Sequence, residues 1–165
     1  MVNLSIAFLL LFSPIWPLGN THKLGDPYVI VNKAANRLAY IEEGKVKEVY
    51  KVATGRSKEL TPEGDFTITV KAVDPYYRKK DIPGGDKTNP LGTRWIGFDA
   101  QNTDGRTFGI HGNNNPSAIG RFVTAGCIRM YEKDVQKLYT KIKIGTKIEV
   151  IHSQNSFEEI LKSQE

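Results

Sequence analysis

Short runs of β-branched and aromatic residues, separated by turn-forming Gly, Pro, Asn and Asp, recur along most of this chain. Such runs favour strands, and the turn residues between them keep each strand short. We expect strands at residues 28–31, 38–41, 46–52, 66–73, 94–98, 108–110 and 146–151. Only one central segment, 132–139, spaces its apolar residues as a helix does, at Val135, Leu138 and Tyr139. The pattern predicts a mainly β fold, an antiparallel sandwich or partly open barrel, with one principal packed helix.

The length of 165 residues suits a single domain with a sizeable core. We place this domain at residues 27–152 and expect a polar C-terminal tail at 153–165, with a short helix around Phe157. Inside the domain, residues 74–92 are rich in Pro and Gly and are expected to form a long irregular loop. Loops of this length are often lids or binding loops.

Residues 1–20 carry no charged side chain and include the apolar run 4–12. That run is too short to span a bilayer comfortably, but it fits the apolar part of a secretory signal. No Lys or Arg precedes it and no Ala-x-Ala site follows, Gly19 being the nearest small residue. We expect an exported protein of the cell wall, with residues 1–20 as a signal peptide or, if uncleaved, a membrane anchor. The alternative is a buried N-terminal segment of a cytosolic protein.

The formal net charge of +5 is compatible with nucleic acid, anionic lipid or an anionic wall polymer, and does not choose among them. An aromatic and basic cluster at 76–80 lies in the long loop. It suits one wall of a peptide cleft, so Tyr76 and Tyr77 are weak candidates for substrate contact. Stacking on single-stranded nucleic acid is one alternative, and a plain solvated loop is another. We expect no nucleic-acid partner, because that reading requires a cytosolic chain with a contiguous basic face.

Cys127 is the only cysteine of the chain. It lies two residues before Arg129 and sixteen residues after His111. A lone thiol with a basic neighbour, and a histidine that the fold brings within reach, is typical of an activated nucleophile. A small buried hydrophobic residue is the alternative. An exported protein usually pairs its cysteines, so an odd one suggests a reactive thiol.

The sequence around these residues resembles the L,D-transpeptidases, the YkuD-like family of bacterial cell-wall enzymes that includes the ErfK, YbiS, YcfS and YnhG types. The family pattern is His-Gly, a spacer, then Ser/Thr-x-Gly-Cys-x-Arg, and it stands here as His111-Gly112 and Thr124-Ala125-Gly126-Cys127-Ile128-Arg129. Pro62-x-Gly64-x-Phe66 and residues 91–96 resemble further family elements. Many members carry His where this chain has Ala125. The resemblance covers about residues 27–151.

The chemistry of these residues suggests a role for each. His111 is expected to accept the proton of Cys127, giving a thiolate–imidazolium pair with a depressed thiol pKa. The resemblance implies that a backbone carbonyl, and not an Asp, orients the other side of His111. The N–H groups of Gly126 and Cys127 are candidates for an oxyanion hole. Arg129 would face the same side as Cys127 and clamp a carboxylate or stabilise the thiolate, the alternative being a solvated surface arginine.

Neighbouring residues are expected to support the motif. We predict that Thr124 is structural, that Gly112 allows close approach of substrate, and that Asn113 is either a turn former or a substrate donor. His22 and His152 have no partners at ligand spacing, so no metal site is expected. No diffusible cofactor is implied.

The resemblance implies peptidoglycan stem peptides as donor and acceptor substrates. A Cys127 thioester would form with release of a terminal D-Ala, and an amine of a second stem would then form a 3-3 cross-link. Water as acceptor would give an L,D-carboxypeptidase, and another cysteine peptidase of the cell wall is also possible. A non-catalytic wall-polymer-binding domain is the alternative outside enzymes. We expect a monomer and a target of carbapenems.

Overall fold

The computed structural model describes residues 25–164, so the segment 1–20 lies outside the described residues. Within this part of the chain the strands are β1 (Tyr28–Asn32), β2 (Arg37–Glu42), β3 (Lys45–Gly55), β4 (Gly64–Val73), β5 (Arg94–Phe98), β6 (Phe108–His111), β7 (Phe122–Thr124), β8 (Ile128–Met130) and β9 (Lys147–Ile151). The α-helices are α1 (Glu132–Lys141) and α2 (Phe157–Lys162). Three 3-10 turns are η1 (Arg78–Lys80), η2 (Ala100–Asn102) and η3 (Pro116–Ala118). The mainly β fold and its principal helix are confirmed.

The strands form one sheet that closes on itself. Its order is β2-β1-β9-β4-β5-β6-β8-β3-β7, and an additional pairing of β2 with β3 completes the ring. Closure removes the exposed strand edges that an open sheet would present. Most pairs are antiparallel as predicted, but β1–β9, β3–β7 and β6–β8 are parallel. The parallel pair β6–β8 is the one that matters most for function, because it carries the Cys127 motif.

The barrel interior holds the main hydrophobic core. Alternate residues of β1 and β2, such as Val29, Val31 and Leu38, point inward and are fully buried. Helix α1 adds Val135 and Leu138 to the same core, as its spacing predicts. The last turn of α1 is held from β4, because the Lys71 ammonium donates to carbonyls in that turn. Satisfying these terminal carbonyls stabilises the helix end.

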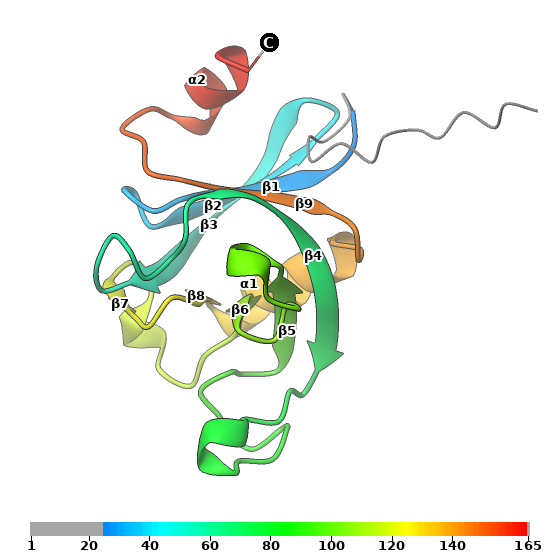
Figure 1. The fold of residues 1–165 in the computed structure, drawn as a ribbon, viewed down its shortest axis with the longest axis vertical. Coiled ribbons are helices and arrows are strands. Elements are labelled where there is room, and N and C mark those ends of the chain that lie inside the picture. Colours follow the sequence, from blue (N-terminus) through cyan, green and yellow to red (C-terminus); the bar gives the residue numbers. More distant parts are fainter. Residues whose placement is uncertain (1–24, 165) are drawn as a thin grey trace, which may run out of the picture.

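Helix α2 covers the outer side of β1 and β2, at the end of the molecule where the chain finishes (Figure 1). Phe157 and Ile160 pack there against Tyr28, Ile30 and Ala39. Ser156 and Glu159 form a capping box at its start, with reciprocal hydrogen bonds of 3.2 and 2.7 Å. The short helix expected around Phe157 is therefore present, and its apolar side is buried on the barrel.

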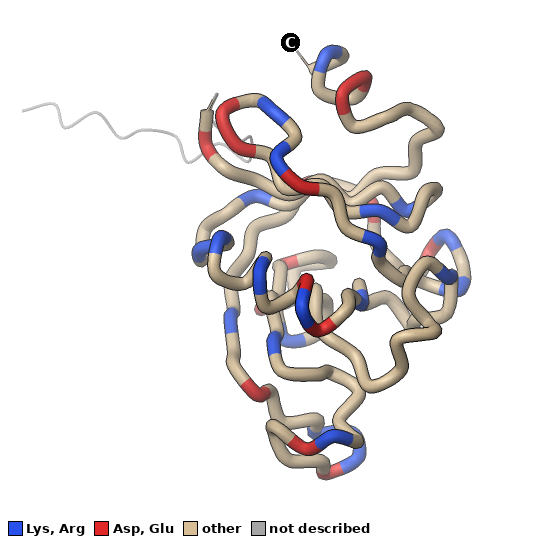
Figure 2. The backbone as a smooth tube through the Cα atoms, turned by 180° about the vertical axis from the view of Figure 1, so that it is seen from behind, with Lys and Arg blue, Asp and Glu red and all other residues tan. Residues whose placement is uncertain are grey.

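Residues 74–93 form the predicted irregular loop between β4 and β5, and η1 is its only helical turn. This loop lies at the end of the molecule opposite α2 (Figure 1). Lys and Arg positions are spread over the fold and interspersed with Asp and Glu (Figure 2). No helix among residues 25–164 is long and apolar enough to cross a membrane.

Candidate active site

Two adjacent parallel strands bring the predicted catalytic residues together. In the register of β6 and β8, Ile110 lies beside Ile128 and His111 beside Arg129. Cys127 comes directly before β8, so it lies next to Gly109. Side chains two residues apart on a strand share a face. Cys127, Arg129 and His111 therefore project to one side of the sheet, although sixteen residues separate His111 from Cys127 in sequence.

The Cys127 thiol is half-buried and opens on a groove. The groove has a volume of about 390 Å³ and is bounded on one side by residues of the 74–92 loop. Tyr76, Tyr77, Arg78 and Lys79 line it, which agrees with the predicted cleft wall. The thiol donates a weak hydrogen bond to the Thr107 carbonyl at 3.5 Å. The sulfur is therefore accessible from a groove that a peptide could enter.

His111 is held by its own neighbour in sequence. Its Nδ1 lies 2.8 Å from the Gly112 carbonyl oxygen. A carbonyl only accepts hydrogen bonds, so Nδ1 carries the proton and Nε2 is the basic nitrogen of the neutral ring. This is the backbone carbonyl that the resemblance implied. The imidazole is 3% exposed and stacks on Trp95, with centroids 5.6 Å apart.

Burial shifts the pKa values of both His111 and Cys127. Burial first, and the Arg129 charge second, lower the pKa of His111 to about 4, against the opposing effect of the Gly112 and Leu91 carbonyls, which accept hydrogen bonds from the ring. Burial raises the pKa of the Cys127 thiol, against the Gly109 N–H and the positive charges of Arg129 and Lys79. Desolvation outweighs the local charges for both groups. Both shifts disfavour the charged form of the group concerned, so they oppose the thiolate–imidazolium pair with a depressed thiol pKa that we expected for the resting protein.

Arg129 lies beside this pair with unused hydrogen-bonding capacity. Its Nε is buried and has no hydrogen-bond partner among the described residues. A buried guanidinium nitrogen without a partner carries a desolvation cost, which an anionic group of a ligand would remove. The half-buried position is not that of a solvated surface arginine.

Comparison with known proteins agrees with this geometry. The family model of the L,D-transpeptidase catalytic domain (YkuD) matches residues 26–150. The chain belongs to the L,D-transpeptidase family. It is 55% identical over 154 residues to YqjB of Bacillus subtilis (strain 168), which is named as an L,D-transpeptidase, covering 93% of this chain and 88% of that protein.

Solved L,D-transpeptidases share the fold at lower identity. A crystal structure from Stackebrandtia nassauensis superposes with a TM-score of 0.60 and 23% identity, covering 82% of this chain. This chain spans 60% of that protein. The catalytic domain of the Enterococcus faecium L,D-transpeptidase, solved by NMR as acylated by ertapenem, has a TM-score of 0.58 and 22% identity. It covers 79% of this chain and is itself covered completely.

One of the two candidate oxyanion donors of this L,D-transpeptidase domain already has a hydrogen-bond partner. The Gly126 N–H donates to the Thr124 hydroxyl at 3.1 Å, and that hydroxyl donates to the Cys127 carbonyl at 2.6 Å. The Gly126 N–H is thus occupied inside the loop, and only the Cys127 N–H of the predicted pair remains as a candidate donor. Thr124 has the structural role predicted for it, because it ties the nucleophile loop to itself.

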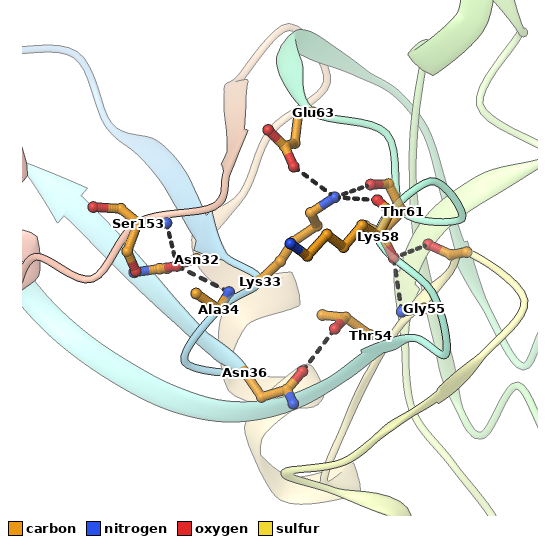
Figure 3. Close-up of polar contacts among 11 residues, drawn as sticks. Asn32, Lys33, Ala34, Asn36, Thr54, Gly55, Lys58, Thr61, Glu63 and Ser153 are labelled. Atoms are coloured by element: carbon orange, nitrogen blue, oxygen red, sulfur yellow. Dashed lines mark hydrogen bonds and ion pairs between the residues drawn. The ribbon is translucent and has the colours of Figure 1, made fainter.

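Two residues that sequence reasoning missed support this loop from behind (Figure 3). Thr61 is completely buried; its hydroxyl accepts from the Gly55 N–H at 2.9 Å and donates to the Gly126 carbonyl at 3.0 Å. The buried Lys33 ammonium holds the Thr61 carbonyl at 2.8 Å and pairs with Glu63 at 2.9 Å. Thr61 directly precedes the Pro62-x-Gly64 element, which was a usable signal. Nothing in the sequence near Lys33 points to the site.

Gly112 and Asn113 both pack against Glu132. A Cβ atom on Gly112 would lie 1.7 Å from Oε1 of Glu132, so the space beside Gly112 is filled by that carboxylate and not by substrate. Asn113 is buried; its backbone N–H donates to Glu132 at 2.7 Å and its amide nitrogen donates to the Met130 carbonyl. Neither contact is the local one that a turn former makes, because both tie the loop after His111 to distant residues, Glu132 and Met130. Glu132 itself was missed, because a Glu at a helix start is unremarkable in sequence.

Proposed function

We propose that this L,D-transpeptidase transfers the acyl group of a peptidoglycan stem peptide through a thioester on Cys127. The sulfur attacks the carbonyl of the L-centre residue that precedes a terminal D-Ala. The C–N bond to D-Ala breaks and the thioester remains. An amine of a second stem then attacks the thioester, which regenerates the thiol and forms a 3-3 cross-link between the two stems.

In the proposed mechanism Cys127 and His111 are both neutral at rest, and the proton path follows from that starting state. As sulfur attacks, its proton moves to Nε2 of His111, and the same proton then passes to the departing D-Ala amine. In the second half, the acceptor amine loses a proton to Nε2, which returns it to the sulfur. The Gly112 carbonyl at 2.8 Å from Nδ1 supports this proposal, because a proton held on Nδ1 makes Nε2 the basic nitrogen of the neutral ring.

The charges around the groove support an anionic peptide as substrate. Arg129 has a buried Nε without a partner among the described residues, and Arg78, Lys79 and Arg106 line the groove. Stem peptides carry free carboxylates, which guanidinium groups bind bidentately. The Cys127 N–H is the proposed donor to the oxyanion of the tetrahedral intermediate.

We further propose that the protein is exported through residues 1–20 and acts on the wall as a monomer. The apolar composition of that segment supports export. Fractionation of cells should find the protein outside the cytoplasm, and a purely cytosolic pool would contradict the wall assignment. Sedimentation of the purified domain should give the mass of one chain.

The decisive experiment follows the reaction by mass spectrometry with purified tetrapeptide muropeptides. We expect an acyl adduct on Cys127, released D-Ala and a cross-linked dimer, all absent with Cys127→Ala. Formation of tripeptide and D-Ala without a cross-linked dimer would show that the protein is a carboxypeptidase and not a transpeptidase. Binding of muropeptides with no adduct and no D-Ala would favour the wall-polymer-binding alternative.

A further inference from the structure

Glu132, the first residue of α1, contacts the loop that follows His111. Its Oε1 accepts the Asn113 N–H at 2.7 Å. Its Oε2 accepts the N–H and the hydroxyl of Thr93, at 3.1 and 2.7 Å. An acidic residue in a first helical turn usually needs no other explanation than the helix dipole. Here the carboxylate is half-buried and bridges the His111 loop and the start of β5.

The surrounding backbone makes room for this carboxylate. A Cβ atom at Gly112 would lie 1.7 Å from Oε1, and one at Gly92 would lie 1.9 Å from the same oxygen. Either distance is far inside van der Waals contact, so two segments that are distant in sequence both require glycine here. The position of the carboxylate is therefore built into the fold and is not one rotamer of a free surface side chain.

The peptide that Glu132 holds is the peptide that orients the catalytic histidine. The Gly112 carbonyl and the Asn113 N–H belong to one planar unit and point in opposite directions. The carbonyl end accepts His111 Nδ1 at 2.8 Å, while the N–H end donates to the carboxylate. A charge-assisted bond at one end fixes the plane and polarises the carbonyl at the other end, which makes it a better acceptor.

We propose that Glu132 is a positioning residue for His111, acting through the Gly112–Asn113 peptide. It takes the place that an Asp has in a Ser-His-Asp triad, with one peptide unit between the carboxylate and the imidazole. The peptide holds the proton on Nδ1 and keeps Nε2 as the nitrogen that exchanges protons with Cys127. The proposal rests on the proposed function, because it assumes that His111 is the catalytic base.

The test compares Glu132→Gln with a matched variant of the same helical turn, Asp134→Asn. Each change removes one negative charge from the first turn of α1. Asp134 makes no hydrogen bond to the loop after His111 in the described part of the chain. In Glu132→Gln the negative charge is lost, and an NH2 group must face one of the two backbone N–H groups, of Asn113 or Thr93, that the carboxylate accepts, so the anchor of the peptide is weakened.

Two measurements separate positioning from mere folding. The first is the rate constant for acylation of Cys127 at saturating donor peptide, together with its KM. We expect Glu132→Gln to lower the rate constant about tenfold to a hundredfold, as small misplacements of catalytic groups do, with KM within about twofold. The second is the 15N spectrum of His111, assigned with His111→Gln. We expect one Nδ1–H tautomer in the wild type and in Asp134→Asn, and a mixture in Glu132→Gln.

A wild-type rate and a single tautomer in Glu132→Gln would overturn the proposal, as would equal losses in Glu132→Gln and Asp134→Asn. Thr93→Val serves if Glu132→Gln does not fold. It removes only the hydroxyl from Oε2 and leaves the Asn113 contact, so we expect a lower melting temperature with one tautomer. A mixture in Thr93→Val equal to that of free histidine would refute the relay. If the wild type forms no acyl adduct, the proposed function fails, while the tautomer comparison still tests Glu132.

Discussion

Thr61→Val tests whether the nucleophile loop is held by the buried hydroxyl behind it. Thr61 is completely buried, and valine keeps its shape while losing the hydroxyl. Two buried backbone groups then lose their partners: the Gly55 N–H at 2.9 Å and the Gly126 carbonyl at 3.0 Å. Each buried group left unpaired costs about 1–3 kcal/mol, so we expect the free energy of unfolding to fall by about 2–6 kcal/mol.

The loss should extend to catalysis because of the peptide that Thr61 holds. The Gly126 carbonyl and the Cys127 N–H belong to one planar unit, so the hydroxyl that fixes the carbonyl also aims the N–H. Gly126 has φ +134, and a Cβ there would lie 2.4 Å from the Leu60 carbonyl, so this unit is closely packed. An oxyanion donor is worth about 3 kcal/mol, which sets an upper limit of about a hundredfold on the loss of acylation rate.

The assay combines urea unfolding with single-turnover acylation followed by intact mass. Acylation is measured without urea, where the variant is still folded, so that the two effects are separated. Thr61→Ser is the control: it keeps the hydroxyl and loses one methyl group, at about 1 kcal/mol. An unfolding free energy within about 0.5 kcal/mol of the wild type, a margin typical of neutral surface changes, or an unchanged acylation rate in Thr61→Val, would refute this reasoning.

Four further predictions concern the catalytic pair. Cys127→Ala and His111→Ala should each abolish acylation, and the double variant should be no worse than either, because the two act as one unit; additive losses would contradict the pairing. The pH midpoint of Cys127 alkylation should lie above that of the urea-unfolded chain, because burial raises the folded pKa; a lower midpoint would restore the thiolate–imidazolium pair. As the pH falls from about 6.5, the ordinary pKa of histidine, to about 4, the free energy of unfolding should fall more steeply for the wild type than for His111→Gln. In this range the unfolded chain binds a proton on His111, whereas the buried imidazole of the folded protein does not. Parallel curves in urea unfolding would argue against a neutral His111. A carbapenem should give one covalent adduct, which peptide mapping places at Cys127, because the same sulfur can attack the strained β-lactam carbonyl. An adduct at another residue would contradict Cys127 as the nucleophile.

The sequence alone determined the local elements and the reacting groups. Runs of β-branched and aromatic residues predicted seven of the nine described strands but missed the three-residue strands β7 and β8. The spacing of Val135, Leu138 and Tyr139 predicted α1, because such a period is a property of a single segment. Cys127, His111 and Arg129 were identified because the family pattern, His-Gly followed by Ser/Thr-x-Gly-Cys-x-Arg, can be recognised from the order of residues alone. A peptide-cleft wall was one of three interpretations of Tyr76 and Tyr77, and their place in the groove beside Cys127 favours it.

Only the tertiary structure decided how these groups are held and charged. The pairing of β2 with β3 that closes the barrel, and the parallel register of β6 and β8, depend on contacts between distant segments. Burial is a property of the assembled fold, so the sequence identified Cys127 and His111 but could not show that desolvation disfavours the charged form of each. For the same reason Thr61 and Glu132 escaped notice. Thr61 acts through the Gly126 carbonyl and Glu132 through the Asn113 N–H, both of which are distant in sequence. Every residue type carries such backbone groups, so the sequence does not show which of them is bound.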